Sequence, residues 1–281
     1  MVVIEKIVDV ETHDDETLKH LQSVQLEMLK DFIAMCSENN LNYVIHSGTA
    51  LGAVRHGGFI PWDDEIDVVM FREDYEKFIR LFKNGNDKYF LSNWYTSLDV
   101  DEKYLSPKSL LCLKNTDLSY DLTKLGIYID VSVIDNIPQG KYKTKLLMKV
   151  VNRIYYFMHI LLILKSDIYR SRNKERFGHF LKFSSDLFHI DANFFAKLFT
   201  KMIKRYYKKT GYVFDMSAVY EASFLQEYFE KTTKIKFEDI LVNIPTEYDK
   251  ILKGYYGNYM ELPPVEERRS HCCGKVDFGD Y

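Results

Sequence analysis

The densest run of potential metal ligands in the chain lies between residues 63 and 67. Four acids fall within these five positions: Asp63, Asp64, Glu65 and Asp67. Carboxylates this close repel one another unless positive charge lies among them. Carboxylate oxygens are also the ligands that hard divalent cations such as Mg²⁺ prefer. The run therefore indicates a cation site, and the alternative is a solvated acidic turn.

The spacing of Glu65 and Asp67 places both carboxylates on one face of a predicted strand, residues 66–71. Side chains two positions apart in a strand point to the same side, and the apolar residues that alternate with them then face the core. Two carboxylates on one face beside a loop suit a divalent cation.

A second predicted strand repeats this arrangement. In GIYIDVSVI, residues 126–134, four apolar side chains form one face, and Asp130 lies on the other. An aspartate in so apolar a strand is costly unless it is paired or bound to metal, although backbone amides could also cap it in the core. Glu65, Asp67 and Asp130 together could hold one or two metal ions against a diphosphate.

Gly48 and Thr49, followed by Gly52, lie where a predicted strand turns into a helix. Small residues at such a turn let backbone N–H groups approach phosphate oxygens, and a helix N-terminus favours negative charge. Arg55 and His56 could add positive charge to the same pocket, with a surface role as the alternative.

The segment Ser47–Met70, SGTALGAVRHGGFIPWDDEIDVVM, resembles the signature of the LicD family of phosphotransferases. The tail Glu247–Pro264, EYDKILKGYYGNYMELPP, is similar to the C-terminal motif of that family. The resemblance implies a nucleotidyltransferase-like fold with Glu65, Asp67 and Asp130 as the Mg²⁺ or Mn²⁺ ligands. Glu65 stands where the family commonly has Asp, and glutamate reaches one methylene further.

The resemblance also implies the reaction. It is metal-dependent transfer of phosphocholine, or a related phospho-alcohol, from a CDP-linked donor to a hydroxyl of a cell-surface glycan or teichoic acid precursor, with release of CMP. We expect CDP-choline as the donor, a lipid-linked glycan as the acceptor, and no nucleic-acid partner. A nucleotide-sugar-dependent glycosyltransferase and a non-catalytic CDP-ligand-binding protein remain the alternatives.

Further residues are candidates for contact with substrate. Asp63 or Asp64 could orient the acceptor hydroxyl or accept its proton, and both stay open. Lys108 and Lys114 flank a predicted strand, and either could reach a phosphate or be solvated. Trp62 could face a quaternary ammonium, or pack in the core. The expected substrate-binding residues are Gly48, Thr49, Arg55, His56, Trp62, Lys114 and His271.

Hydrophobic periodicity predicts the elements that position these residues. Amphipathic helices are predicted over 14–39 and 73–83, with a further helix at 246–253. The other predicted strands are 43–46, 88–94 and 110–114, and the strand that carries Asp130 is predicted over 127–134. Helices and strands in this mixture indicate a mixed α/β core of the α+β type.

Length and composition are those of an ordinary globular protein. The chain has 281 residues, of which 46% are hydrophobic and 28% charged, which excludes disordered, collagen-like and coiled-coil chains. The net charge of −3 hides an asymmetry, because residues 141–211 hold 17 Lys/Arg and 4 Asp/Glu. We therefore expect a catalytic core from residues 1–140 and 212–281 and a basic helical insertion at 141–211.

The basic insertion, with predicted helices at 141–165 and 191–209, has two interpretations. It is either an interfacial segment on an anionic membrane or a helical subdomain packed on the core. Its apolar run Ile154–Leu164 is too short to span a bilayer. The acidic N-terminus lacks the apolar region of a signal peptide, and four cysteines make no disulfide framework. We expect a cytoplasmic protein, with peripheral contact at the inner membrane face under the first interpretation.

Overall fold

The computed structural model describes residues 14–82, 86–93, 108–120, 123–140, 142–151, 153–154, 192–204, 210–215, 223–268, 270 and 275–281. The chain forms two compact units. The first contains residues 1–92, 108–133 and 228–281, and the second contains residues 93–107 and 134–227. Most of the expected insertion lies outside the described residues, so its boundaries at 141 and 211 stay a prediction.

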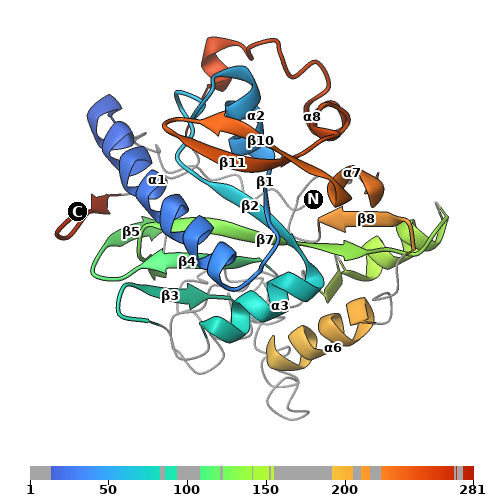
Figure 1. Ribbon diagram of the computed structural model, residues 1–281. Helices are drawn as coiled ribbons and strands as arrows, with labels where there is room; N and C mark the ends of the chain where they lie inside the picture. Colours follow the sequence, from blue (N-terminus) through green and yellow to red (C-terminus); the bar gives the residue numbers. More distant parts are fainter. Residues whose placement is uncertain are drawn as a thin grey trace, which may run out of the picture. The chain divides into compact units, whose positions relative to one another are not determined.

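The first unit is built on a sheet with the strand order β1-β2-β7-β4-β3 (Figure 1). Strands β1 and β2 are antiparallel, as are β3 and β4, and β4 and β7. The register places Leu110 of β4 opposite Asp130 of β7. The strands are β1 (Val44–Ile45), β2 (Asp67–Phe71), β3 (Tyr89–Ser92), β4 (Ser109–Leu113) and β7 (Tyr128–Asn136).

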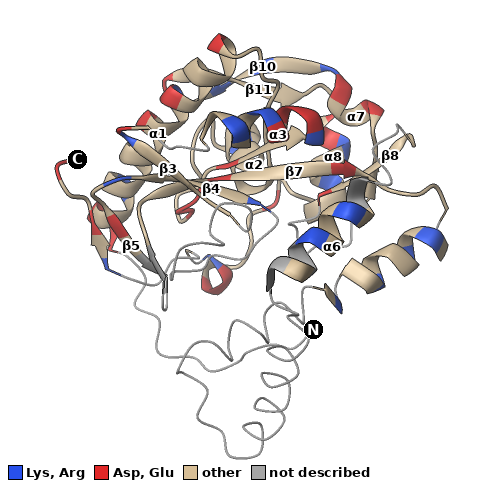
Figure 2. Cartoon of the chain, turned by 90° about the horizontal axis from the view of Figure 1, so that it is seen from below, with Lys and Arg blue, Asp and Glu red and all other residues tan. Residues whose placement is uncertain are grey.

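Two amphipathic helices, α1 (Asp15–Glu38) and α3 (Arg72–Leu81), lie on the same side of this sheet in both views (Figures 1 and 2). Each buries one apolar stripe. The rings of Phe32 and Phe78 meet edge to face with centroids 5.7 Å apart, which joins the two helices. Both helices confirm the predictions from sequence periodicity, with bounds that differ by at most two residues at each end.

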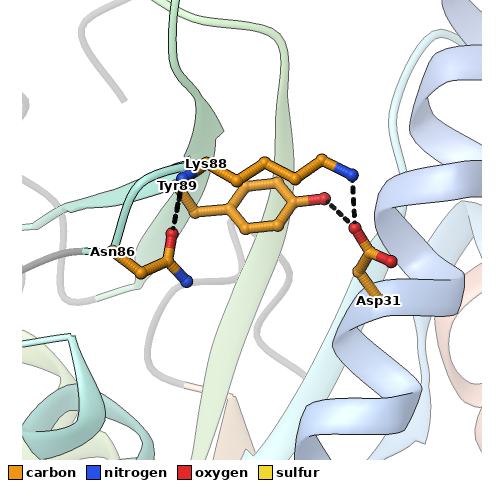
Figure 3. Close-up of polar contacts among 4 residues, drawn as sticks. All are labelled: Asp31, Asn86, Lys88 and Tyr89. Carbon is orange, nitrogen blue, oxygen red and sulfur yellow. Dashed lines mark hydrogen bonds and ion pairs between the residues drawn. The ribbon is translucent and has the colours of Figure 1, made fainter.

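A polar contact fastens α1 to β3 on the first unit (Figure 3). Asp31 of α1 accepts hydrogen bonds from Lys88 Nζ at 2.6 Å and from the Tyr89 hydroxyl at 2.7 Å. The Asn86 side chain accepts from the backbone N–H groups of Lys88 and Tyr89 and so shapes the start of the strand. One carboxylate here has two donors, and one of them is cationic.

The first unit contains further helices and strands besides these. A hairpin of β10 and β11 turns at Glu238, whose φ is +53°. The carboxylate of Glu238 accepts a hydrogen bond from the backbone N–H of Phe59 at 2.9 Å, which fastens the hairpin to the loop before the acid run. These elements are α2 (Ser47–Arg55), β5 (Asp117–Tyr120), β6 (Thr123–Leu125), β10 (Thr232–Phe237), β11 (Ile240–Pro245), α8 (Tyr248–Tyr256), η2 (Val265–Glu267) and β12 (Val276–Asp277).

The second unit includes the last residues of β7. These pair antiparallel with β8 (Tyr212–Asp215), which in turn pairs with β9 (Ser223–Leu225). A helix at residues 142–151 and α6 (Ala192–Lys204) belong to this unit, and α7 (Glu227–Glu230) begins where the first unit resumes. Among the described residues, no helix combines the length and the apolar character needed to cross a membrane. Helices and a mixed sheet in one chain confirm the mixed α/β class.

Candidate metal and substrate site

The side chains of Glu65, Asp67 and Asp130 converge on one point of the first unit. Each offers a carboxylate oxygen, and the three oxygens lie within 4.8 Å of one another. Glu65 and Asp67 are partly exposed, whereas Asp130 is buried. Two adjacent strands, β2 and β7, therefore bring acids that are more than sixty residues apart in sequence into one cluster.

Both backbone polar groups of Asp67, its N–H and its carbonyl, are hydrogen-bonded. Its N–H donates to the hydroxyl of Thr49 at 2.8 Å, and its carbonyl accepts from the N–H of His46 at 3.0 Å. Thr49 is buried in the first turns of α2. The start of α2 thus fixes the residue that opens β2, and this fixes where the Asp67 carboxylate points.

Asp130 is the third residue of β7, a strand that is buried along almost its whole length. Its backbone N–H donates to the carbonyl of Ile66 at 2.8 Å, which ties β7 to the residue before β2. Its carboxylate forms an ion pair with Lys108, the residue before β4. A buried carboxylate is stabilised by such a partner, since an isolated charge would be costly to bury.

Helix α1 holds the acid loop in place through two glutamines. Gln22 Nε2 donates to the carbonyl of Asp63 at 2.7 Å. The fully buried Gln25 donates from Nε2 to the carbonyls of Asp64 at 2.8 Å and Tyr128 at 3.2 Å. One side chain therefore bridges the loop that carries Glu65 and the strand that carries Asp130.

The electrostatics of the cluster are unfavourable without a cation. Burial raises the pKa of Asp67 well above its usual value, and the negative charges of Asp130 and Glu65 raise it further. Lys108 opposes this effect but supplies one positive charge against three acids. A divalent cation among the three carboxylates would relieve the repulsion, so the residues present fit such an ion.

Asp63 lies against the first turn of α2. A Cβ added at Gly48 would come within 2.6 Å of Asp63 Oδ2, so a larger residue there would displace this carboxylate. Helix N-termini attract negative charge, so the carboxylate is well placed there. Asp63 thus lies beside the Gly48–Thr49 turn that was expected to bind phosphate, and Asp64 beside it is fully buried. The substrate roles of these residues stay predictions.

Arg55 and His56 lie toward the C-terminal tail motif. The Arg55 guanidinium donates to the carbonyl of Tyr259 at 2.9 Å and to His56 Nε2 at 3.0 Å. Burial lowers the pKa of His56, and the charge of Arg55 lowers it further, which favours the neutral ring. Trp62 meets His56 edge to face and carries the Arg268 guanidinium over its ring at 5.2 Å.

Of the two remaining candidates, Lys114 is not brought to the acids. Lys114 follows the other end of β4, and its Nζ donates to the carbonyl of Asn86 at 2.6 Å. In the register of β4 with β7, the residue opposite Asp130 is Leu110, so Lys108 and not Lys114 lies at the acid end of the strand. His271 lies outside the described residues, as do Cys272 and Cys273.

Three positioning contacts escaped the sequence. Gln22 and Gln25 appear there only as polar positions on an amphipathic helix, and nothing in their spacing marks them as partners of the acid loop. His46 is a further case, because its Nε2 lies 3.2 Å from the hydroxyl of Tyr255 in α8. The one signal for that contact is that His46 adjoins the first motif quoted above and Tyr255 lies within the second.

Comparison with known proteins agrees with this geometry. Residues 40–110, which include Glu65, Asp67 and Lys108, match the family model described as "LicD/FKTN/FKRP, nucleotidyltransferase domain". Over 257 residues the chain is 28% identical to the lipopolysaccharide cholinephosphotransferase LicD of Haemophilus influenzae. That alignment covers 91% of this chain and 96% of the relative.

A shorter match joins the chain to an uncharacterized protein, RP689, of Rickettsia prowazekii. It is 48% identical over 48 residues, which is 17% of this chain and 18% of that protein. The family-model match and the nearly full-length relative agree with each other. Together they support a phosphotransferase of the LicD family.

Proposed function

We propose that the chain transfers phosphocholine from a CDP-linked donor, CDP-choline first among them, to a hydroxyl of a cell-surface glycan and releases CMP. The observation that carries this proposal is the convergence of Glu65, Asp67 and Asp130 within 4.8 Å. The relative named as a lipopolysaccharide cholinephosphotransferase supports the transferred group and the kind of acceptor.

The proposed metal is Mg²⁺ or Mn²⁺, held by Glu65, Asp67 and Asp130. Among the described residues the donor set consists of three carboxylates, which are the ligands that hard cations prefer. When bound, such an ion neutralises charge on the donor diphosphate and orients it. Lys108 keeps the Asp130 carboxylate in place.

The reaction requires one bond to form and one to break. The acceptor hydroxyl oxygen attacks the phosphorus that bears choline, the bond from that phosphorus to the bridging oxygen breaks, and CMP leaves with the electron pair. The hydroxyl proton passes to Asp63 or Asp64, whose backbone carbonyls Gln22 and Gln25 hold. Positioning supplies much of the acceleration in phosphoryl transfer.

The remaining expectations belong to the same proposal. The Gly48–Thr49 turn and Arg55 position the donor, Trp62 faces the quaternary ammonium, and the domain has a nucleotidyltransferase-like fold. The acceptor is a lipopolysaccharide or a teichoic acid precursor. A glycosyltransferase would instead release a nucleoside diphosphate, and a non-catalytic protein would bind CDP-choline without turnover.

The test is CMP release by the full chain from CDP-choline with phosphocholine-free lipopolysaccharide and Mg²⁺. Parallel reactions with CDP-ethanolamine, CDP-glycerol and CDP-ribitol identify the alcohol. We expect acceptor-dependent CMP release that EDTA abolishes. Release of UDP or GDP from nucleotide sugars, or CDP-choline binding with no turnover on any acceptor, would contradict the proposal.

A further inference from the structure

The described helices of the second unit expose apolar side chains to solvent. In the helix at residues 142–151, the outward side chains Tyr142, Leu146 and Val150 are 89%, 64% and 38% exposed. They are four residues apart, so they form one stripe along the helix. Leu147 and Val151 are buried on the opposite side, so the helix already has an apolar face toward its own unit.

Cations flank this stripe. Lys145 and Lys149 lie three and seven residues after Tyr142, and both are exposed, as are Lys143 and Arg153. At 100° per residue, these four cations surround the apolar stripe on the outward half of the helix. The sequence 142–151 contains no acid. The outward face is therefore both apolar and cationic.

Helix α6 repeats the pattern independently. Phe194 and Leu198, 48% and 36% exposed, are four residues apart, and Met202 follows at the same spacing. Lys197 and Lys201 again lie three and seven residues after the first apolar position, and both are exposed. This helix also contains no acid, and only blue charged residues are seen on it (Figure 2).

The shared pattern restricts the occupant. Lysines can extend their charged heads toward phosphates while their stems and the apolar side chains enter a less polar layer. A second copy of the chain would bring the same cations against each other. A nucleic acid would match the cations but would leave the apolar stripes without a partner.

We propose that the outward faces of the helix at 142–151 and of α6 bind the surface of an anionic lipid bilayer. The helices lie in the headgroup layer, because apolar residues on only one outward stripe insert to shallow depth. The lysines contact lipid phosphates, and Leu146 and Leu198 enter the upper acyl region. Binding is peripheral, and it weakens as salt screens the lysines.

The test is flotation of the full chain with phosphatidylcholine vesicles, with and without phosphatidylglycerol. We expect the wild-type chain to float with the anionic vesicles at low salt and to remain in the soluble fraction with phosphatidylcholine alone. Added salt lowers binding to the anionic vesicles. Failure to float with anionic vesicles at low salt would overturn the proposal.

Matched variants locate the contact. Leu146→Glu lowers the partition constant at least about tenfold, because the leucine side chain that enters the lipid layer is replaced by a charged one. Leu241→Glu is its control, since Leu241 is 61% exposed on β11 of the first unit. Equal binding by these two variants would overturn the proposal. Circular dichroism confirms that both fold.

A lysine pair provides a second, conservative test that keeps the apolar stripe intact. Lys145→Gln with Lys149→Gln lowers partitioning by roughly twenty-five-fold, since each basic residue near an anionic surface contributes about fivefold. Lys234→Gln with Lys236→Gln, on the exposed edge of β10, is the matched control and retains wild-type binding. A stable dimer in sedimentation that Leu146→Glu abolishes would show that a second copy occupies the face and would contradict the membrane assignment.

Discussion

Two clusters of carboxylates on the first unit differ in how their charge is balanced. At the contact between α1 and β3, one acid, Asp31, receives hydrogen bonds from Lys88 and Tyr89 (Figure 3). Burial alone would raise the pKa of Asp31, but these two donors outweigh burial and lower it. The charged carboxylate is therefore favoured there, and the contact stabilises the fold.

The cluster at β2 and β7 has the opposite balance. Three carboxylates lie close together, Lys108 forms an ion pair with one of them, Asp130, and burial together with Asp130 and Glu65 raises the pKa of Asp67. A carboxylate therefore stabilises the fold where hydrogen-bond donors balance its charge, as at Asp31. It destabilises the fold where other carboxylates surround it, as at Asp67. Acids kept in excess at the start of two adjacent strands indicate a role outside folding, and binding a cation is the role that their geometry fits.

The largest expected difference between the two clusters is in activity, when one aspartate in each is replaced by asparagine. We expect Asp67→Asn to lower CMP release at least about a hundredfold, because metal-ion stabilisation of transition-state charge amounts to several kcal/mol. Its melting temperature stays the same or rises, since one repelling charge is removed. Asp31→Asn is the matched control and keeps its activity. Near-normal transfer by Asp67→Asn would contradict the assignment.

Substitution of the two lysines that flank β4 should lower the free energy of unfolding by different amounts. Lys108→Met leaves the buried Asp130 carboxylate without its cation and lowers the free energy of unfolding by about 3 kcal/mol. Lys114→Met removes only a hydrogen bond to a backbone carbonyl at the other end of the strand and costs about 1 kcal/mol or less. Urea denaturation measures both. Equal losses would show that Lys108 does not balance the cluster.

The backbone support of Asp67 tests positioning. Thr49→Val removes the hydroxyl that accepts the Asp67 N–H, and we expect a loss of about 1–2 kcal/mol in unfolding free energy together with lower activity. Thr49→Ser keeps the hydroxyl but loses the methyl group. We therefore expect it to retain more CMP release than Thr49→Val. If serine and valine at this position were equally impaired in CMP release, the hydroxyl would have no positioning role.

The smallest expected effect concerns the balanced cluster. Because the pKa of Asp31 is lowered in the folded chain, its stabilisation is present above its unfolded value of about 3.9 and is lost as pH falls through the folded pKa. The carboxylate is half exposed, so the contribution is no more than about 1 kcal/mol. Urea titrations at several pH values compare the wild type with Asp31→Asn. The difference between them disappears at low pH, and a difference that persisted there would refute the ion-pair account.

The sequence predicted those features that depend on regular spacing. The helix over 14–39 is α1, and the alternation around Asp67 and Asp130 placed these two acids on strands that prove to be neighbours, with Glu65 two residues before the first of them. Helical spacing and strand alternation both follow from the burial of one apolar face. They can therefore be predicted from the sequence without the tertiary structure.

Features that depend on pairing between distant strands were not predictable. Lys108 and Lys114 look alike in sequence, and only the register of β4 on β7 decides which one meets Asp130. The β10–β11 hairpin was missed because Glu238 adopts positive φ at its turn, where glycine or asparagine is the usual signal. Gln25 was missed because a buried glutamine resembles any polar helix position until its carbonyl partners are known.

The central claim is that Glu65, Asp67 and Asp130 together hold a divalent cation. Titration of Mn²⁺ into the full chain, followed by electron paramagnetic resonance in the presence of CDP-choline, tests it without relying on turnover. We expect stoichiometric Mn²⁺ binding by the wild type and by Asp31→Asn, and loss of this binding in Asp67→Asn and Asp130→Asn. Unchanged Mn²⁺ affinity in the latter two variants, or no binding by the wild type, would contradict the account.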